Sequence, residues 1–171
     1  MKNILILITL ALFSGFAALA QNPKMDKKLK KTLDKTGLTY SLDDDGDYRI
    51  TMEVEKGRTH LIVLNARMDE YQGTFVCDMY GFAGLGDANE FRLSSSEYLE
   101  LLDETGRTKI GGWGAYYSND RTQVGFAYIT KVTVSMTSDE LAAHIYSLAV
   151  IADMKEEEWE KSGINGEVDK W

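Results

Sequence analysis

The chain has 171 residues, of which 44% are hydrophobic and 27% are charged, and its net charge at pH 7 is −8. This hydrophobic content excludes a largely disordered chain. The negative charge argues against nucleic-acid binding, which needs a basic surface. Because Cys77 is the single cysteine, an internal disulfide is excluded and core packing must stabilise the fold.

Residues 1–20 have the pattern of a secretory signal peptide. Lys2 precedes an apolar run from Ile4 to Phe13, and the small residues Ala18 and Ala20 form an A-x-A cleavage site. We expect cleavage after Ala20 and a mature protein that is periplasmic or secreted. No later segment has the ~18 consecutive apolar residues that a membrane-spanning helix needs, so we expect no integral membrane segment.

The first expected element of the mature chain is a helix that begins near Pro23 and ends at Gly37. Apolar residues recur every four positions at Met25, Leu29 and Leu33, which is the spacing of a narrow helical stripe. Proline is favoured at the first helical position and glycine just after the last.

This first helix is rich in lysine. Six lysines against two aspartates give it a local charge of +4, which leaves −13 for the rest of the mature chain: Lys24, Lys27, Lys28, Lys30, Lys31 and Lys35. One interpretation is a solvated face that offsets an acidic body. The other is a docking face for an acidic partner or an anionic headgroup surface, with an affinity that falls as salt rises.

Alternation of apolar and polar residues then predicts a meander of strands. Leu38–Leu42 and Tyr48–Val54 are expected to form a hairpin with one wet face, joined by the acidic turn at 43–47. Leu61–Leu64 is continuously apolar, as in a strand covered on both faces. The fourth run is Thr74–Phe82.

A second helix and a second hairpin follow. Ser94 with Glu97 forms a capping box, and the helix that it opens is expected to end near Gly106. Ile110–Tyr117 and Gln123–Val134 are predicted strands joined by a polar turn.

The last expected helix opens with the capping box of Thr137 and Glu140 and is predicted to fray over residues 155–161. The resulting order is helix, three or four strands, helix, two strands, helix. It predicts an α+β fold, an antiparallel sheet with helices packed on it. We expect residues 21–161 to form a single domain and residues 162–171 to form a polar C-terminal tail.

Several short stretches carry a resemblance to a known family. They are Leu38-Thr39-Tyr40 running into Asp44-Asp45-Gly46-Asp47, Ile110-Gly111 with Trp113, and Thr137 to Leu141. With the element order, they make the region from Met25 to Trp159 similar to the YbjN-like family, which shares the fold of type III secretion chaperones. The resemblance implies a small non-enzymatic domain that binds polypeptide, with a homodimer as one option.

The sequence offers few candidates for metal binding. The turn at 43–47 is rich in aspartate, but placing Gly46 at the sixth position of an EF-hand loop puts Met52 where the twelfth-position glutamate belongs. Asp87, Asn89 and Glu90 form a second, equally unspecific group of oxygen ligands. Solvated turns are the simpler interpretation, and we predict no metal site and no cofactor.

Catalytic candidates are equally few. The spacing of His60 and His144 does not place these histidines together, and His60 shares a strand face with Ile62 and Leu64, which favours a structural role. Cys77 alternates with neighbouring apolar residues and is expected to be a small buried hydrophobe. We therefore predict no catalytic residue.

The most distinctive stretch is the glycine- and aromatic-rich strand near residue 113. Trp113 and Tyr117 are expected on one face, with Gly112, Gly114 and Tyr116 on the other. Glycine lets another backbone approach closely, and aromatic side chains supply binding area, so these five residues are the predicted partner-binding site. The alternative is that glycine relieves crowding under a helix and Trp113 belongs to the core.

The function expected from the sequence is an exported non-catalytic binding module, chaperone- or regulator-like, that engages a protein or peptide through its sheet and its late hairpin. The alternative is a periplasmic small-ligand or metal-binding carrier. An enzyme is a third option, and it would need acidic residues or histidines brought together from distant positions.

Overall fold

The computed structural model describes residues 23–54, 57–118 and 120–164. The predicted signal peptide, with its cleavage site after Ala20, lies outside the described residues, as do residues 165–171 of the predicted tail. None of the helices in the described part of the chain is long and apolar enough to cross a membrane.

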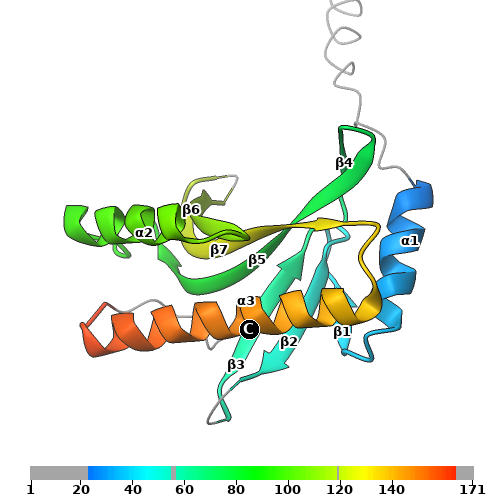
Figure 1. The fold of residues 1–171 in the computed structure, drawn as a ribbon. Coiled ribbons are helices and arrows are strands. Elements are labelled where there is room, and N and C mark those ends of the chain that lie inside the picture. Colours follow the sequence, from blue (N-terminus) through cyan, green and yellow to red (C-terminus); the bar gives the residue numbers. More distant parts are fainter. Residues whose placement is uncertain (1–22, 55–56, 119, 165–171) are drawn as a thin grey trace, which may run out of the picture.

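A seven-stranded sheet is the centre of the fold (Figure 1). Its strands run in the order β1-β2-β3-β5-β7-β6, every pairing is antiparallel, and β4 pairs separately with β5. The bounds are β1 Tyr40–Leu42, β2 Tyr48–Glu53, β3 Thr59–Leu64, β4 Asp69–Tyr71, β5 Thr74–Asp87, β6 Gly111–Tyr117 and β7 Gln123–Thr133. The predicted α+β class is confirmed, and the structure adds the three-residue strand β4 to the predicted meander.

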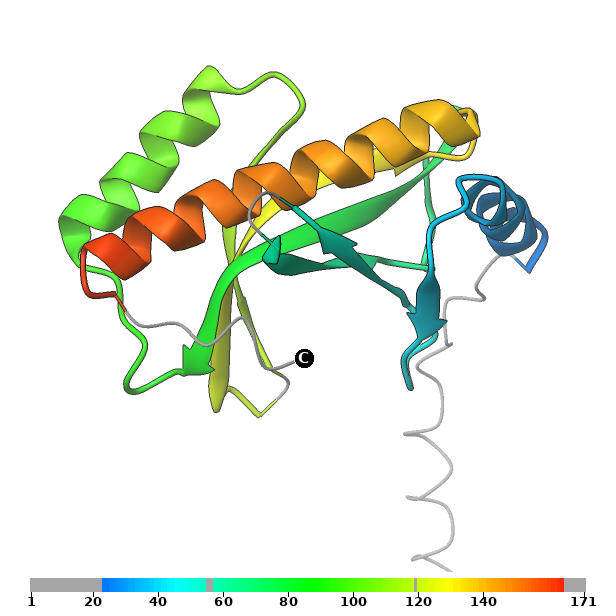
Figure 2. The same ribbon diagram turned by 90° about the horizontal axis from the view of Figure 1, so that it is seen from below.

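Three helices accompany the sheet: α1 (Pro23–Asp34), α2 (Ser95–Arg107) and α3 (Ser138–Lys161). Helices α2 and α3 lie on one side of the sheet, and α1 lies at its β1 end (Figure 2). Both predicted capping boxes are present, with the Ser94 and Thr137 hydroxyls accepting hydrogen bonds from the backbone N–H groups three residues on. These caps satisfy helix donors that would otherwise lack partners.

The predicted fraying of the last helix is wrong. Helix α3 runs without interruption to Lys161, and Lys155, Glu156 and Trp159 are buried in the very stretch that was expected to fray. The charged run stays helical because its buried members find partners on α2 and near β3, as described below.

Two hydrophobic clusters fill the space between the sheet and the helices. The larger cluster joins α1, α3 and the strands β2, β3, β5 and β7, and the smaller cluster lies under α2. In the smaller cluster, the Trp159 ring meets Phe91 and Phe126 edge-on at centroid distances of 6.1 and 5.8 Å. Gly81 lets α3 lie close to β5, since a Cβ there would be 2.9 Å from Leu148 Cγ.

Candidate functional site

Strand β6, which holds all five residues of the predicted partner-binding site, lies at one edge of the sheet. Trp113 is half-buried and contacts both hydrophobic clusters. Its ring meets Tyr128 edge-on at 5.3 Å, and its indole N–H donates to Glu104 Oε2 at 2.7 Å. Trp113 therefore has a structural role that joins β6 to α2.

The tyrosines of β6 lie on opposite faces, as alternation predicts. Tyr116 belongs to the side of the sheet away from α3, where its ring meets Tyr80 edge-on at 4.9 Å, and Tyr80 in turn stacks on Phe82 at 6.4 Å. Tyr117 is 55% exposed, and the Arg121 guanidinium lies 5.8 Å from its ring centroid. Tyr80, Phe82 and Tyr116 form an aromatic group on the sheet face opposite α3, which α2 reaches at Gly112 (Figure 2).

The glycines of β6 make room for neighbours within the chain. A Cβ at Gly112 would lie 2.5 Å from the Thr105 methyl carbon, and a Cβ at Gly114 would lie 2.6 Å from Ile129 Cδ1. Real Cβ atoms essentially never approach other atoms so closely, so a larger residue would force a shift. The space above the two glycines is therefore filled by α2 and β7.

The outer edge of β6 is half-covered by α2. The backbone N–H of Trp113 donates to Thr105 Oγ1 at 2.8 Å, and the carbonyl of Gly111 accepts from Thr108 Oγ1 at 2.5 Å. The backbone N–H of Trp113 therefore points away from β7. Backbone groups alternate in direction along a strand, so the N–H and C=O groups of Ala115 and Tyr117 also point outward, away from β7. No described residue bonds to these outward groups, so this end of β6 is an open strand edge.

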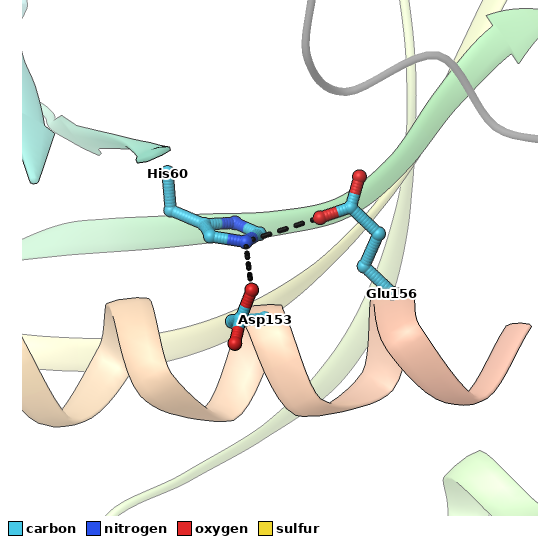
Figure 3. Close-up of side chains that lie close together, drawn as sticks. All are labelled: His60, Asp153 and Glu156. Carbon is cyan, nitrogen blue, oxygen red and sulfur yellow. Dashed lines mark hydrogen bonds and ion pairs between the residues drawn. The ribbon is translucent and has the colours of Figure 1, made fainter. Parts of the chain in front are cut away.

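A buried polar cluster that the sequence analysis missed joins the start of β3 to the C-terminal half of α3 (Figure 3). His60 is buried, and its Nε2 lies 3.0 Å from Asp153 Oδ1 and 3.0 Å from Glu156 Oε2. The Arg58 Nε lies 2.6 Å from the same Asp153 oxygen, and its Nη2 lies 2.8 Å from the same Glu156 oxygen. Its Nη1 lies 3.0 Å from Glu160 Oε2.

The charges of this cluster favour a proton on His60. Burial alone would lower the pKa of His60, but the hydrogen bonds and negative charges of Glu156 and Asp153 outweigh it and raise the pKa. For the carboxyl group of Glu156, burial alone would raise the pKa, but the contacts with His60 and Arg58 outweigh burial and lower the pKa. Three carboxylates against one guanidinium leave a negative excess that a protonated imidazole reduces. The cluster therefore fastens the start of β3 to α3 by ion pairs.

The same three side chains are a possible set of metal ligands, because one nitrogen and two carboxylate oxygens lie within 4.8 Å of one another. Arg58, however, already contacts both of these oxygens. A metal ion would have to displace that guanidinium and the His60 proton. The geometry therefore fits ion pairing better than metal binding.

A second acidic group is compensated in the same way. Glu100, Glu104 and Glu158 also lie close enough to share a cation, and the buried Lys155 occupies that place. Its Nζ lies 2.5 Å from Glu104 Oε1 and 2.7 Å from Glu158 Oε2. This group joins α3 to α2 at the same carboxylate that accepts the Trp113 indole N–H.

The acidic turns use their carboxylates for local structure. Asp43 Oδ1 accepts from the backbone N–H groups of Asp45 and Asp47 at 3.1 and 2.9 Å. Asp87 Oδ1 accepts from the N–H of Asn89 at 2.8 Å. These are the side-chain bonds that aspartate makes in turns.

The remaining chemical candidates lie apart from the buried cluster. Cys77 is buried, and burial raises the pKa of its thiol to about 12, so the thiol stays protonated. His144 places its Nδ1 3.0 Å from the Glu140 carbonyl of its own helix. His60 is therefore not paired with His144, in agreement with the lack of a joint spacing in the sequence.

A weak sequence signal for the buried cluster exists. Asp153, Glu156 and Glu160 are spaced three and four residues apart, which places them on one helix face. Arg58 and His60 are two residues apart and share a strand face. Neither pattern predicts that this helix face contacts this strand face, because 93 residues separate His60 from Asp153.

Comparison with known proteins adds little to this geometry. No family model matches the chain, and no curated protein matches it. Among solved structures, a similar chain is the crystal structure of YbjN from E. coli, a proposed transcription regulator. It is 11% identical, with a TM-score of 0.48, over 81% of this chain and 93% of that chain. The similarity is weak and concerns the overall fold, so it does not assign this chain to the YbjN-like family.

Proposed function

We propose that this chain is an exported, non-catalytic binding module that engages a polypeptide through the open end of β6 and the adjacent sheet face opposite α3. The observation that carries the proposal is the outward backbone of Ala115 and Tyr117 at the sheet edge. An exposed edge strand is a template for strand addition, in which main-chain hydrogen bonds supply affinity and side-chain pockets supply specificity.

The aromatic group beside this edge supports the same function. Tyr116 lies on β6 itself, and Tyr80 and Phe82 lie two strands away on the same face. A bound strand at the edge would bring its side chains toward this face, where aromatic rings supply contact area at low entropic cost. By contrast, α2 blocks the edge at Gly111 and Trp113, which limits strand addition to the second half of β6.

The first experiment is native mass spectrometry of the mature protein purified gently from the periplasm of its host. A mass increment that corresponds to a polypeptide supports the binding module and identifies the partner. A dimer would identify a second copy of this chain as the partner. A monomer with a small constant adduct would favour the alternative function, a small-ligand carrier. The mass of the intact chain in the same spectrum tests the predicted cleavage after Ala20.

The edge itself is tested by Ala115→Pro. Proline removes the outward N–H at position 115 and leaves the inward hydrogen bonds of Gly114 and Tyr116 to β7. Ala115→Val is the matched control, because it keeps the N–H. We expect Ala115→Pro to weaken partner binding by about 10-fold, the value of one hydrogen bond. Equal binding by both variants would show that the partner does not use this edge.

The metal-carrier alternative has one specific observation in its favour, the convergence of His60, Asp153 and Glu156. It predicts that Zn²⁺ or Ca²⁺ raises the melting temperature, and that Glu156→Gln abolishes this rise. Thermal unfolding with each metal and with a chelator is the test. A melting temperature that neither addition changes would eliminate the alternative at this cluster.

A further inference from the structure

We propose that one face of α1 docks the protein on the anionic headgroups of a phospholipid bilayer. This face carries Lys27, Lys28 and Lys31 and is called the lysine face below. This surface is distinct from the β6 edge, and the proposal does not depend on the binding function proposed above. It rests on the position of Lys27, Lys28 and Lys31 on α1, on their lack of ion-pair partners among the described residues and on the absence of a described apolar anchor beside them.

Three lysines of α1, at positions 27, 28 and 31, point away from the rest of the protein. Leu29 and Leu33 are buried, with relative exposures of 1% and 0%, and they fix the inner face of the helix. At 3.6 residues per turn, positions 27, 28 and 31 fall within an arc of about 100° on the opposite face. All three lysines are exposed, so a flat surface can reach them without meeting the body of the protein.

These lysines are also uncompensated. Within the described part of the chain, no ion pair or hydrogen bond reaches the ammonium groups of Lys27, Lys28 or Lys31. Lys30, on the side of the helix, is different, because Asp34 Oδ2 lies 2.9 Å and the Tyr40 hydroxyl 2.9 Å from its Nζ. The outer face of α1 therefore carries a net positive charge on an otherwise acidic protein.

The composition of the face favours lipid over a folded protein partner. Protein interfaces depend on buried aromatic or apolar anchors, and often on arginine, which binds carboxylates through two parallel hydrogen bonds. Among the described side chains the lysine face has neither, since Leu29 and Leu33 are turned inward and α1 contains no arginine. Lysine is a flexible point charge, which suits a fluid layer of phosphate headgroups.

One acidic region lies far from this face. Glu100, Asp103, Glu158 and Glu160 lie on α2 and on the C-terminal part of α3, at the opposite end of the molecule from α1 (Figure 1). An anionic surface would therefore attract the lysine face of α1 more than it attracts the α2 end. The protein would be held with α1 against the headgroups and with the α2 end directed away from them.

The test is co-sedimentation of the mature protein with phosphatidylglycerol–phosphatidylcholine vesicles and with pure phosphatidylcholine vesicles. The test variant is Lys27→Gln/Lys28→Gln/Lys31→Gln. Its control, Lys109→Gln/Lys131→Gln/Lys161→Gln, changes the net charge equally on other parts of the surface. At about 1 kcal/mol for each lysine, we expect the partition coefficient of the test variant to fall on the order of 100-fold. We expect the control to keep most of the wild-type binding.

Salt and an acidic polymer complete the experiment. Wild-type binding to the anionic vesicles should disappear near 1 M salt, where the screening length is about 3 Å. Equal binding to the two kinds of vesicle, or an equal loss in both variants, would overturn the proposal. So would retention on immobilised polyglutamate without vesicle binding, which would identify an acidic polypeptide as the partner of α1.

Discussion

We expect the wild-type protein to lose stability at alkaline pH, and we expect the replacement of His60 by glutamine to remove this loss. Asp153 and Glu156 hold the imidazolium and raise the pKa of His60 above its value in the unfolded chain, about 6.5. A group with a raised folded-state pKa stabilises the fold fully at pH values below its unfolded pKa. That contribution is then lost as the pH rises through the folded pKa.

The magnitude follows from the contacts. A hydrogen bond to a charged group contributes about 1.5–3 kcal/mol. Asp153 and Glu156 each lie 3.0 Å from the same Nε2 atom, so they share one N–H, and desolvation of the fully buried ring opposes the gain. We therefore expect the free energy of unfolding to fall by about 2 kcal/mol across the His60 titration, the value of one such bond.

The assay is urea unfolding of the wild type, His60→Gln and His144→Gln at a series of pH values from about 6 to about 10. The stability gap between the wild type and His60→Gln should be largest at the acidic end and should narrow as the pH rises. His144→Gln should follow the wild type, because the hydrogen bond described for this histidine is to the Glu140 carbonyl of its own helix. A gap that stays constant with pH would refute the reasoning.

Three further outcomes are expected. Gly81→Ala should lower the free energy of unfolding by about 1–3 kcal/mol, because its Cβ would lie 2.9 Å from Leu148. Gly106→Ala should not lower it, because its Cβ would meet nothing within 4 Å. Urea unfolding of both variants checks this. Thr137→Ala should cost about 1 kcal/mol of stability through loss of the α3 cap, and Thr137→Ser should restore it in thermal unfolding. Cys77 should resist a thiol reagent until urea unfolds the protein, and rapid labelling of the folded protein would contradict its burial.

The sequence by itself determined the local elements, because their signals lie within a few residues of one another. The capping boxes at Ser94 and Thr137 lie at the predicted positions, since each depends on a side chain only three residues away. Alternation correctly separated the two faces of β6, because side-chain direction in a strand has a period of two. The signal peptide, the tail and the single-domain boundary stay predictions.

The tertiary structure decided what each face meets. Strand β6 becomes an edge only through the order of the whole sheet, and half of that edge is covered by Thr105 of α2 and by Thr108, which caps the end of α2. The charged run at the end of α3 indicated fraying by composition alone. It remains helical because Lys155 and Glu156 meet partners from α2 and from the residues around β3.

The buried cluster shows the limit of local reasoning most clearly. His60 and Asp153 are 93 residues apart, and nothing near either residue specifies the other. Their contact depends on how α3 crosses the sheet, which is set by the packing of the hydrophobic core as a whole. Short-range patterns therefore determined the helices, strands and caps of this protein, whereas the open edge and the charge cluster arose only when distant segments packed together.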